Sequence, residues 1–110
     1  MRDVEVHDEV REWFVSLSEE LQDRAAGKID LLVEQGDQLR MPHSRALGRG
    51  LFELRFRLGK EARRITYWFA PSGRIVLLTT FRKQRNSERT EVERAHRAKR
   101  DCSAHHGSRE

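Results

Sequence analysis

The sequence predicts a single small α+β domain in which helices pack against one face of a mostly antiparallel sheet. Three observations predict it. Apolar and polar residues alternate along segments 51–57 and 64–69, which a glycine-containing turn separates, and this is typical of a hairpin. In the first third of the chain apolar residues instead recur every three to four positions, as in amphipathic helices. A length of 110 residues suits one hydrophobic core rather than two.

The amino-terminal third predicts one strand and two helices. Residues 4–6 (VEV) are β-branched at two positions and form a short first strand. The next segment carries a helical apolar stripe made of Val10, Trp13, Phe14 and Leu17. Ser18 is suited to cap a second helix, which Gly36 ends. These two helices, joined by almost no loop, are expected to form an antiparallel pair.

The remaining chain predicts a connector, three strands, a helix and a tail. Residues 36–50 contain proline and several glycines and are interpreted as the connector. The strands are 51–57, 64–69 and 75–81, and the last is uniformly apolar, which is typical of a central strand covered on both sides. A helix follows at about 88–100. The order is therefore β-α-α-β-β-β-α, with a domain at 1–100 and a disordered tail at 101–110.

Positive charge gathers in the middle of the chain. The net charge is only +4, but residues 40–85 contain twelve Lys or Arg and two acidic residues, Glu53 and Glu61. This asymmetry favours a polyanion or an acidic protein as the partner over a merely solvated surface.

Arginine occupies the strand face that the helices are expected to leave open. Arg55, Arg57 and Arg64 would lie side by side there, and like charges facing each other destabilise a sheet. The arrangement therefore indicates a function: guanidinium groups bind phosphate oxygens bidentately and stabilise the negative charge of a phosphoryl transition state. Trp68 alternates onto the same face, where it would either stack on an unpaired base or pack under the last helix.

Metal-free RNA cleavage also needs a proton acceptor and a proton donor, and arginine is a poor base. The candidates are Lys83, Tyr67, Glu53, His43 and His96. Tyr67 falls on the core face, and Glu53 is expected to pair with arginines. No cofactor or metal is predicted, because Asp101, Cys102, His105 and His106 fall in the predicted tail. The single cysteine, the charged first residues and the short apolar runs predict a soluble cytoplasmic domain without a membrane span.

The segments LGRGLFELR, RRITYWF and FRK resemble the RelE/HigB toxin superfamily, and most of all its phage-derived Gp49-like branch. The resemblance extends over about residues 4–100. It implies a RelE-like fold and the toxin component of a type II toxin–antitoxin system. Such a toxin is an endoribonuclease (mRNA interferase) that cleaves messenger RNA on the ribosome by metal-independent 2′-hydroxyl attack and inhibits translation. The implied partner is a cognate antitoxin with a helix-turn-helix domain.

The resemblance also implies site residues. By position in the resemblance, the expected catalytic residues are Arg64, Lys83 and Arg85, and Arg55 and Arg57 match residues that contact RNA in relatives. Arg63, Trp68 and Arg82, which the resemblance does not place, complete the expected RNA-binding residues. After FRK, the segment 83–92 has no tyrosine or histidine acid at the place where relatives have one, so the acid and base stay open. Two alternatives also stay open: a ParE-like toxin of the same fold that inhibits DNA gyrase, and a non-catalytic RNA-binding module.

Overall fold

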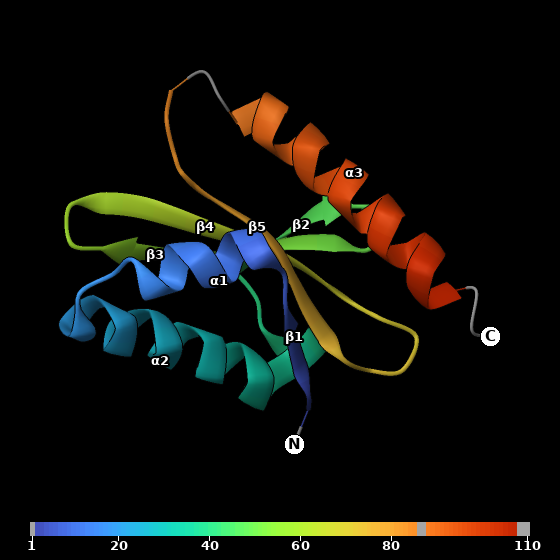
Figure 1. Cartoon of the computed structure of the whole chain (residues 1–110), viewed down its shortest axis with the longest axis horizontal. Coiled ribbons are helices and arrows are strands. Elements are labelled where there is room, and N and C mark those ends of the chain that lie inside the picture. The colour runs from blue at the N-terminus through green and yellow to red at the C-terminus, as the bar shows by residue number, and fades with distance from the viewer. Residues whose placement is uncertain (1, 86–87, 108–110) are drawn as a thin grey trace.

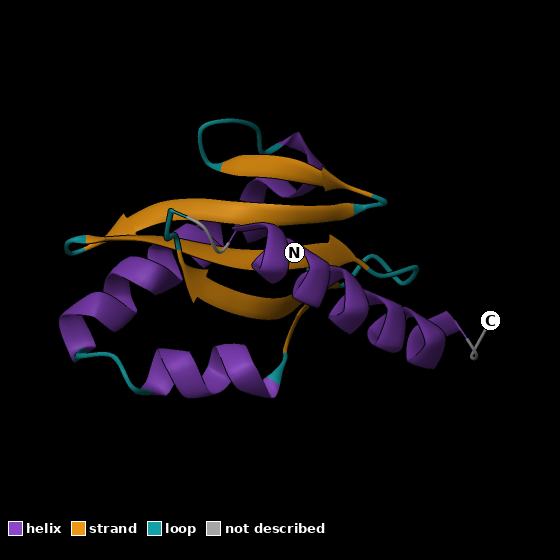
Figure 2. Ribbon diagram, turned by 90° about the horizontal axis from the view of Figure 1, so that it is seen from above, coloured by secondary structure: helices purple, strands orange, loops and turns teal. Residues whose placement is uncertain are grey.

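The computed structural model describes residues 2–85 and 88–107 and confirms the predicted α+β class. Its elements are β1 (Val4–Val6), α1 (Asp8–Val15), α2 (Glu19–Gln35), a short 3₁₀ turn η1 (Gly36–Gln38), β2 (Ser44–Gly48), β3 (Leu51–Leu58), β4 (Glu61–Phe69), β5 (Ile75–Arg82) and α3 (Glu88–Gly107). The five strands form one twisted sheet in the order β1-β5-β4-β3-β2 (Figures 1 and 2). β1 runs parallel to β5, and the other neighbours are antiparallel.

Local signals in the sequence place the helices as expected. The side chain of Ser18 accepts a hydrogen bond from the backbone N–H of Leu21 and so caps α2. Gly36 ends α2 with a positive φ of 55°, and an added Cβ there would lie 2.3 Å from the guanidinium carbon of Arg2. The predicted connector holds one element that the pattern did not reveal, the edge strand β2, which pairs with β3.

Helices α1 and α2 cover the predicted face of the sheet. Phe52, Leu54 and Phe56 of β3 point toward them, together with Ile65 and Tyr67 of β4. Buried residues of both helices, including Val10 and Leu32, complete this core.

The prediction that all helices pack on one face is wrong for α3, which lies on the opposite side of the sheet from α1 and α2 (Figure 1). The physical reason is that this face also carries apolar residues that need cover. Leu51, Trp68, Val76 and Leu78 are all buried there, and Ala95 of α3 packs on them. β5 is accordingly covered on both sides, as its uniform apolar pattern predicted.

The prediction of a disordered tail from residue 101 does not hold for its first residues, because α3 continues to Gly107. Cys102 is buried with the second core, which gives this polar segment an apolar contact and prolongs the helix. Residues 108–110 lie outside the described residues. None of the described helices is long and apolar enough to cross a membrane.

Candidate nucleic-acid interface

The register of β3 and β4 brings two of the predicted arginines face to face. Arg55 pairs directly with Arg64, and Arg57 pairs with Ala62 two residues nearer the turn. Directly paired residues of an antiparallel sheet point to the same face. The alternation read from the sequence therefore places Arg55, Arg57 and Arg64 together, on the face opposite α1 and α2.

These arginines line an open hollow of about 360 Å³ at the end of the sheet. Lys83 joins them because its backbone N–H donates to the carbonyl of Ala62 at 2.8 Å, which holds the chain beside β4 after β5 has ended. Pro42, from the connector that precedes β2, forms another part of the wall. We name this feature the arginine hollow, defined by Arg55, Arg57, Arg64 and Lys83.

The three arginines differ in exposure. Arg57 is exposed and donates to the carbonyl of Lys60 at 3.1 Å. Arg55 is partly buried, and Arg64 is only 5% exposed, with its Nη1 donating to the carbonyl of Arg63 at 3.1 Å. An anion that enters the hollow would thus meet Arg57 at the rim and Arg64 at the base.

A buried carboxylate lies beneath the arginine hollow. Glu53 is 0% exposed, and its Oε2 lies 3.7 Å from Nε of Arg55 and 3.8 Å from Nε of Arg64. The pairing predicted from the sequence is therefore present as two ion pairs. Neither carboxylate oxygen has a hydrogen-bond partner among the described residues, and the two Nε atoms have none either. Burial raises the pKa of Glu53, and the nearby charge of Arg64 opposes that rise without cancelling it.

The arginine hollow keeps an excess of positive charge. Burial lowers the pKa of Arg64, and the neighbouring charge of Arg55 lowers it further. A guanidinium nevertheless stays protonated in proteins, so the repulsion between Arg55 and Arg64 persists. An anion bound in the hollow would relieve this repulsion, which is the physical argument for a phosphate site.

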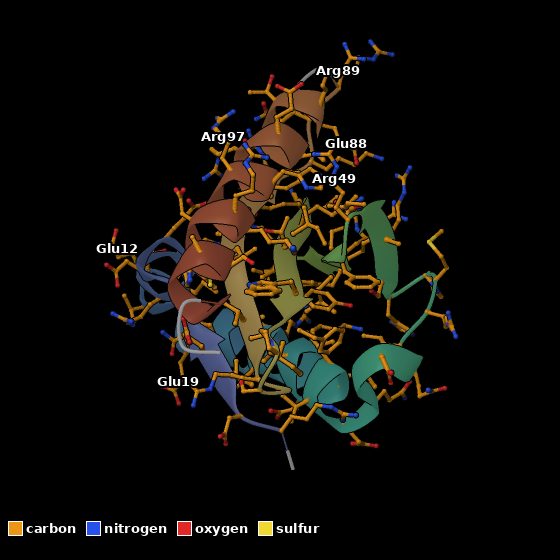
Figure 3. The ribbon with its side chains drawn as sticks, turned by 90° about the vertical axis from the view of Figure 1, so that its right-hand side faces the viewer. Glu12, Glu19, Arg49, Glu88, Arg89 and Arg97 are labelled. Atoms are coloured by element: carbon orange, nitrogen blue, oxygen red, sulfur yellow. The ribbon has the colours of Figure 1, made fainter. Side chains whose placement is uncertain are left out.

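One acidic residue near the arginines was not expected from the sequence. Glu88, the first residue of α3, lies 4.0 Å from Arg45, and its charge acts on both Glu53 and Arg64. Figure 3 shows Glu88 at the amino end of the helix. In the sequence, only the alternative in which Trp68 packs under the last helix linked α3 to this face.

The remaining predicted arginines lie elsewhere. Arg63 and Arg82 form a direct pair on the opposite face, where the guanidinium of Arg63 lies 4.7 Å from the ring centroid of Trp13 in α1. Arg63 also pairs with Glu61 at 3.2 Å. Arg85 is exposed in the segment after β5. The structure therefore does not gather these three residues into the arginine hollow.

Two positions were considered for Trp68 from the sequence, stacking on a base or packing under the last helix, and the structure shows the second. It is 6% exposed in the core beneath α3, and Nζ of Lys99 lies 4.8 Å from its ring centroid. A base cannot reach the ring while α3 is in this place.

His43 is not part of the lining, but it follows Pro42 and its carbonyl accepts a hydrogen bond from the N–H of Arg55 at 2.8 Å. Two other proton-transfer candidates are separated from the hollow. Tyr67 is buried on the opposite face, where its hydroxyl is hydrogen-bonded to that of Ser44, and burial raises its pKa. His96 lies on α3 and lines a different hollow with Arg49 and Arg97. Among the residues that line the arginine hollow, Lys83 is the one besides the arginines whose side chain carries N–H protons.

Comparisons with known proteins agree with this architecture. The model of the family described as phage-derived protein Gp49-like matches residues 12–102. A solved structure of a mutant of the E. coli toxin RelE in the free state is similar in fold, with a TM-score of 0.60 and 9% sequence identity, over 86% of this chain and 92% of that one. No curated protein matches the sequence. The chain therefore belongs to the phage-derived Gp49-like protein family and has a RelE-like fold.

Proposed function

We propose that the protein is the cytoplasmic toxin of a type II toxin–antitoxin system and cleaves messenger RNA on the ribosome. The observation that carries the proposal is the arginine hollow, in which Arg55, Arg57, Arg64 and Lys83 converge on one open space. Membership of the Gp49-like family and the RelE-like fold support the same reading.

In the proposed reaction the ribose 2′-oxygen attacks the adjacent phosphorus, and the bond to the 5′-oxygen of the next nucleotide breaks. The products carry a 2′,3′-cyclic phosphate and a 5′-hydroxyl. Arg64 and Arg55 stabilise the additional negative charge on the phosphate oxygens, and Arg57 at the rim holds the RNA backbone. The ammonium of Lys83 donates the proton that the leaving oxygen needs.

The lining of the arginine hollow also supports dependence on the ribosome. The residues that line it include no carboxylate and no histidine among the described residues, so the lining itself offers neither of these groups as an acceptor for the 2′-hydroxyl proton. Arg85, which lies outside the hollow, stays a candidate for contacts that form only with the substrate. A site that is incomplete alone suits an enzyme that acts only on a larger assembly.

A cognate antitoxin with a helix-turn-helix domain is the proposed protein partner. The excess of positive charge around Arg55 and Arg57 suits acidic side chains of such a protein as well as RNA.

Induced expression in a bacterial host separates RNA cleavage from gyrase inhibition. We expect protein synthesis to stop within minutes and cleaved transcripts to accumulate, while plasmid supercoiling and the DNA-damage response stay unchanged. Primer extension, plasmid topology gels and a damage-response reporter measure the three quantities. Intact transcripts together with DNA damage would contradict the proposal and support the gyrase alternative.

A further inference from the structure

Three potential metal ligands meet at the edge of the sheet farthest from β2. Glu5 is the middle residue of β1, and because Val4 and Val6 pack against the α1–α2 core, Glu5 points to the other face. His7 follows β1 directly, as the residue before α1, and its N–H donates to the carbonyl of Leu77 at 3.0 Å. Cys102 approaches the same place from the carboxyl-terminal part of α3.

The ligand atoms are already close to one another. One atom from each of Glu5, His7 and Cys102 lies within 4.8 Å of the other two, and Nε2 of His7 is 3.7 Å from Oε2 of Glu5. Bonds of about 2.0–2.3 Å to Zn²⁺ place tetrahedral ligands roughly 3.3–3.8 Å apart. Small rotations of the side chains would therefore bring all three onto one ion.

The three side chains differ in exposure. Cys102 is buried, and burial together with the charge of Glu5 raises the pKa of its thiol, while Trp68 and the positive charge of Lys99 oppose that rise. The side chains of His7 and Glu5 are 31% and 33% exposed, which gives an ion a route from solvent and leaves room for a water ligand. A thiolate, an imidazole and a carboxylate form a ligand set that Zn²⁺ accepts readily.

We propose that Glu5, His7 and Cys102 bind a Zn²⁺ ion, with water as the fourth ligand. The thiol releases its proton to solvent as the sulfur–zinc bond forms. The ion then fastens the last helix to the first strand, which lie at opposite ends of the sequence, and so stabilises the fold. Because β1 is an edge strand that β5 separates from β4, whereas the arginine hollow is lined by residues of β3 and β4, the site is independent of the proposed RNA chemistry.

The sole cysteine of the chain gives the test a specific signal. Any thiolate-to-metal charge-transfer absorption of Co²⁺, used as a spectroscopic substitute for Zn²⁺, must come from Cys102. We expect untagged protein to show this near-ultraviolet band at one equivalent of Co²⁺, and Zn²⁺ to displace it. Cys102→Ser should lack the band, and His7→Ala and Glu5→Gln should each weaken Zn²⁺ binding by about tenfold or more in chelator competition.

Two controls keep the outcome specific. His96→Ala changes a histidine of α3 that is not in the cluster, and a variant with both His105→Ala and His106→Ala removes the histidines near the end of the helix. Both should bind Zn²⁺ as the unchanged protein does, and Zn²⁺ should raise their unfolding temperature. Absence of the band in the folded protein would overturn the proposal. Binding that survives His7→Ala and Glu5→Gln but is lost in the double histidine variant would also overturn it.

Discussion

At the residue scale, two glutamates beside arginines have opposite pKa shifts because their surroundings differ. Glu53 is fully buried between Arg55 and Arg64 without hydrogen bonds to either, and desolvation raises its pKa. Partial burial also acts to raise the pKa of Glu9, but hydrogen bonds from Arg94 and from the N–H of Thr80 outweigh it and lower that pKa. Whether the carboxylate accepts hydrogen bonds, more than the proximity of an arginine, therefore determines the direction of the pKa shift.

Replacing Glu53 with glutamine is expected to remove the part of the pH dependence of the free energy of unfolding that comes from the titration of Glu53. A raised pKa in the folded state means that the folded protein binds more protons than the unfolded chain. The contribution of Glu53 to stability is therefore greatest below its ordinary value of 4.5 and declines as pH rises through the folded-state pKa. Urea unfolding of the unchanged protein and of Glu53→Gln between about pH 4 and pH 8 measures it.

The expected result is that the free energy of unfolding of the unchanged protein, relative to that of the variant, falls with rising pH. A relative stability that stays constant or rises over this range would contradict the account of Glu53 as a desolvated carboxylate.

At the element scale, the position of α3 is the main feature that the sequence did not reveal. Its alanines and its cysteine form too thin an apolar stripe to show which face it covers. The alternation in β3 and β4 and the cap at Ser18 did predict their elements, because these signals are local. β2 was missed because the segment 44–48 is short, lies at an edge and contains glycine.

The ion pair between Arg94 and Glu9 holds α3 to the start of α1. Nη2 of Arg94 donates to Oε2 of Glu9 at 2.8 Å, and Nη1 donates to Oε1. Glu9→Gln keeps the size of the side chain and an acceptor for Thr80 but removes the charge. Because both side chains are partly exposed, we expect a loss of about 1 kcal/mol at neutral pH.

The loss of stability caused by Glu9→Gln should shrink as pH falls. Because the pKa of Glu9 is lowered in the folded state, its contribution to stability is fully present above the ordinary value of 4.5 and is lost as pH falls through the folded-state pKa. Glu12→Gln is the matched control, because Glu12 is exposed on the same helix and points away from the fold (Figure 3). Denaturant unfolding at two pH values gives the comparison. Equal stability of the two variants at neutral pH would contradict the proposed role of the pair.

At the scale of the whole molecule, part of the candidate site could be predicted from the sequence. Strand alternation was sufficient for Arg55, Arg57 and Arg64, since the period of a strand determines its faces. It was not applied to Arg63 and Arg82, which basic character alone suggested for RNA contact. Their register pairs them on the opposite face, where Arg63 contacts Trp13 of α1. Burial of Trp68 depended on where α3 packs, which is a tertiary property.

The central claim is that the arginine hollow cleaves RNA, and a cleavage assay on translating ribosomes with purified protein tests it most directly. If Arg64 stabilises the transition state, Arg64→Ala should reduce the rate of messenger RNA cleavage by about 100-fold or more. Arg24→Ala, which removes one exposed positive charge from α2, should cleave at the rate of the unchanged protein. The fragments should carry 2′,3′-cyclic phosphate and 5′-hydroxyl ends. Cleavage by folded Arg64→Ala at the unchanged rate, or fragments with 3′-hydroxyl and 5′-phosphate ends, would contradict the account.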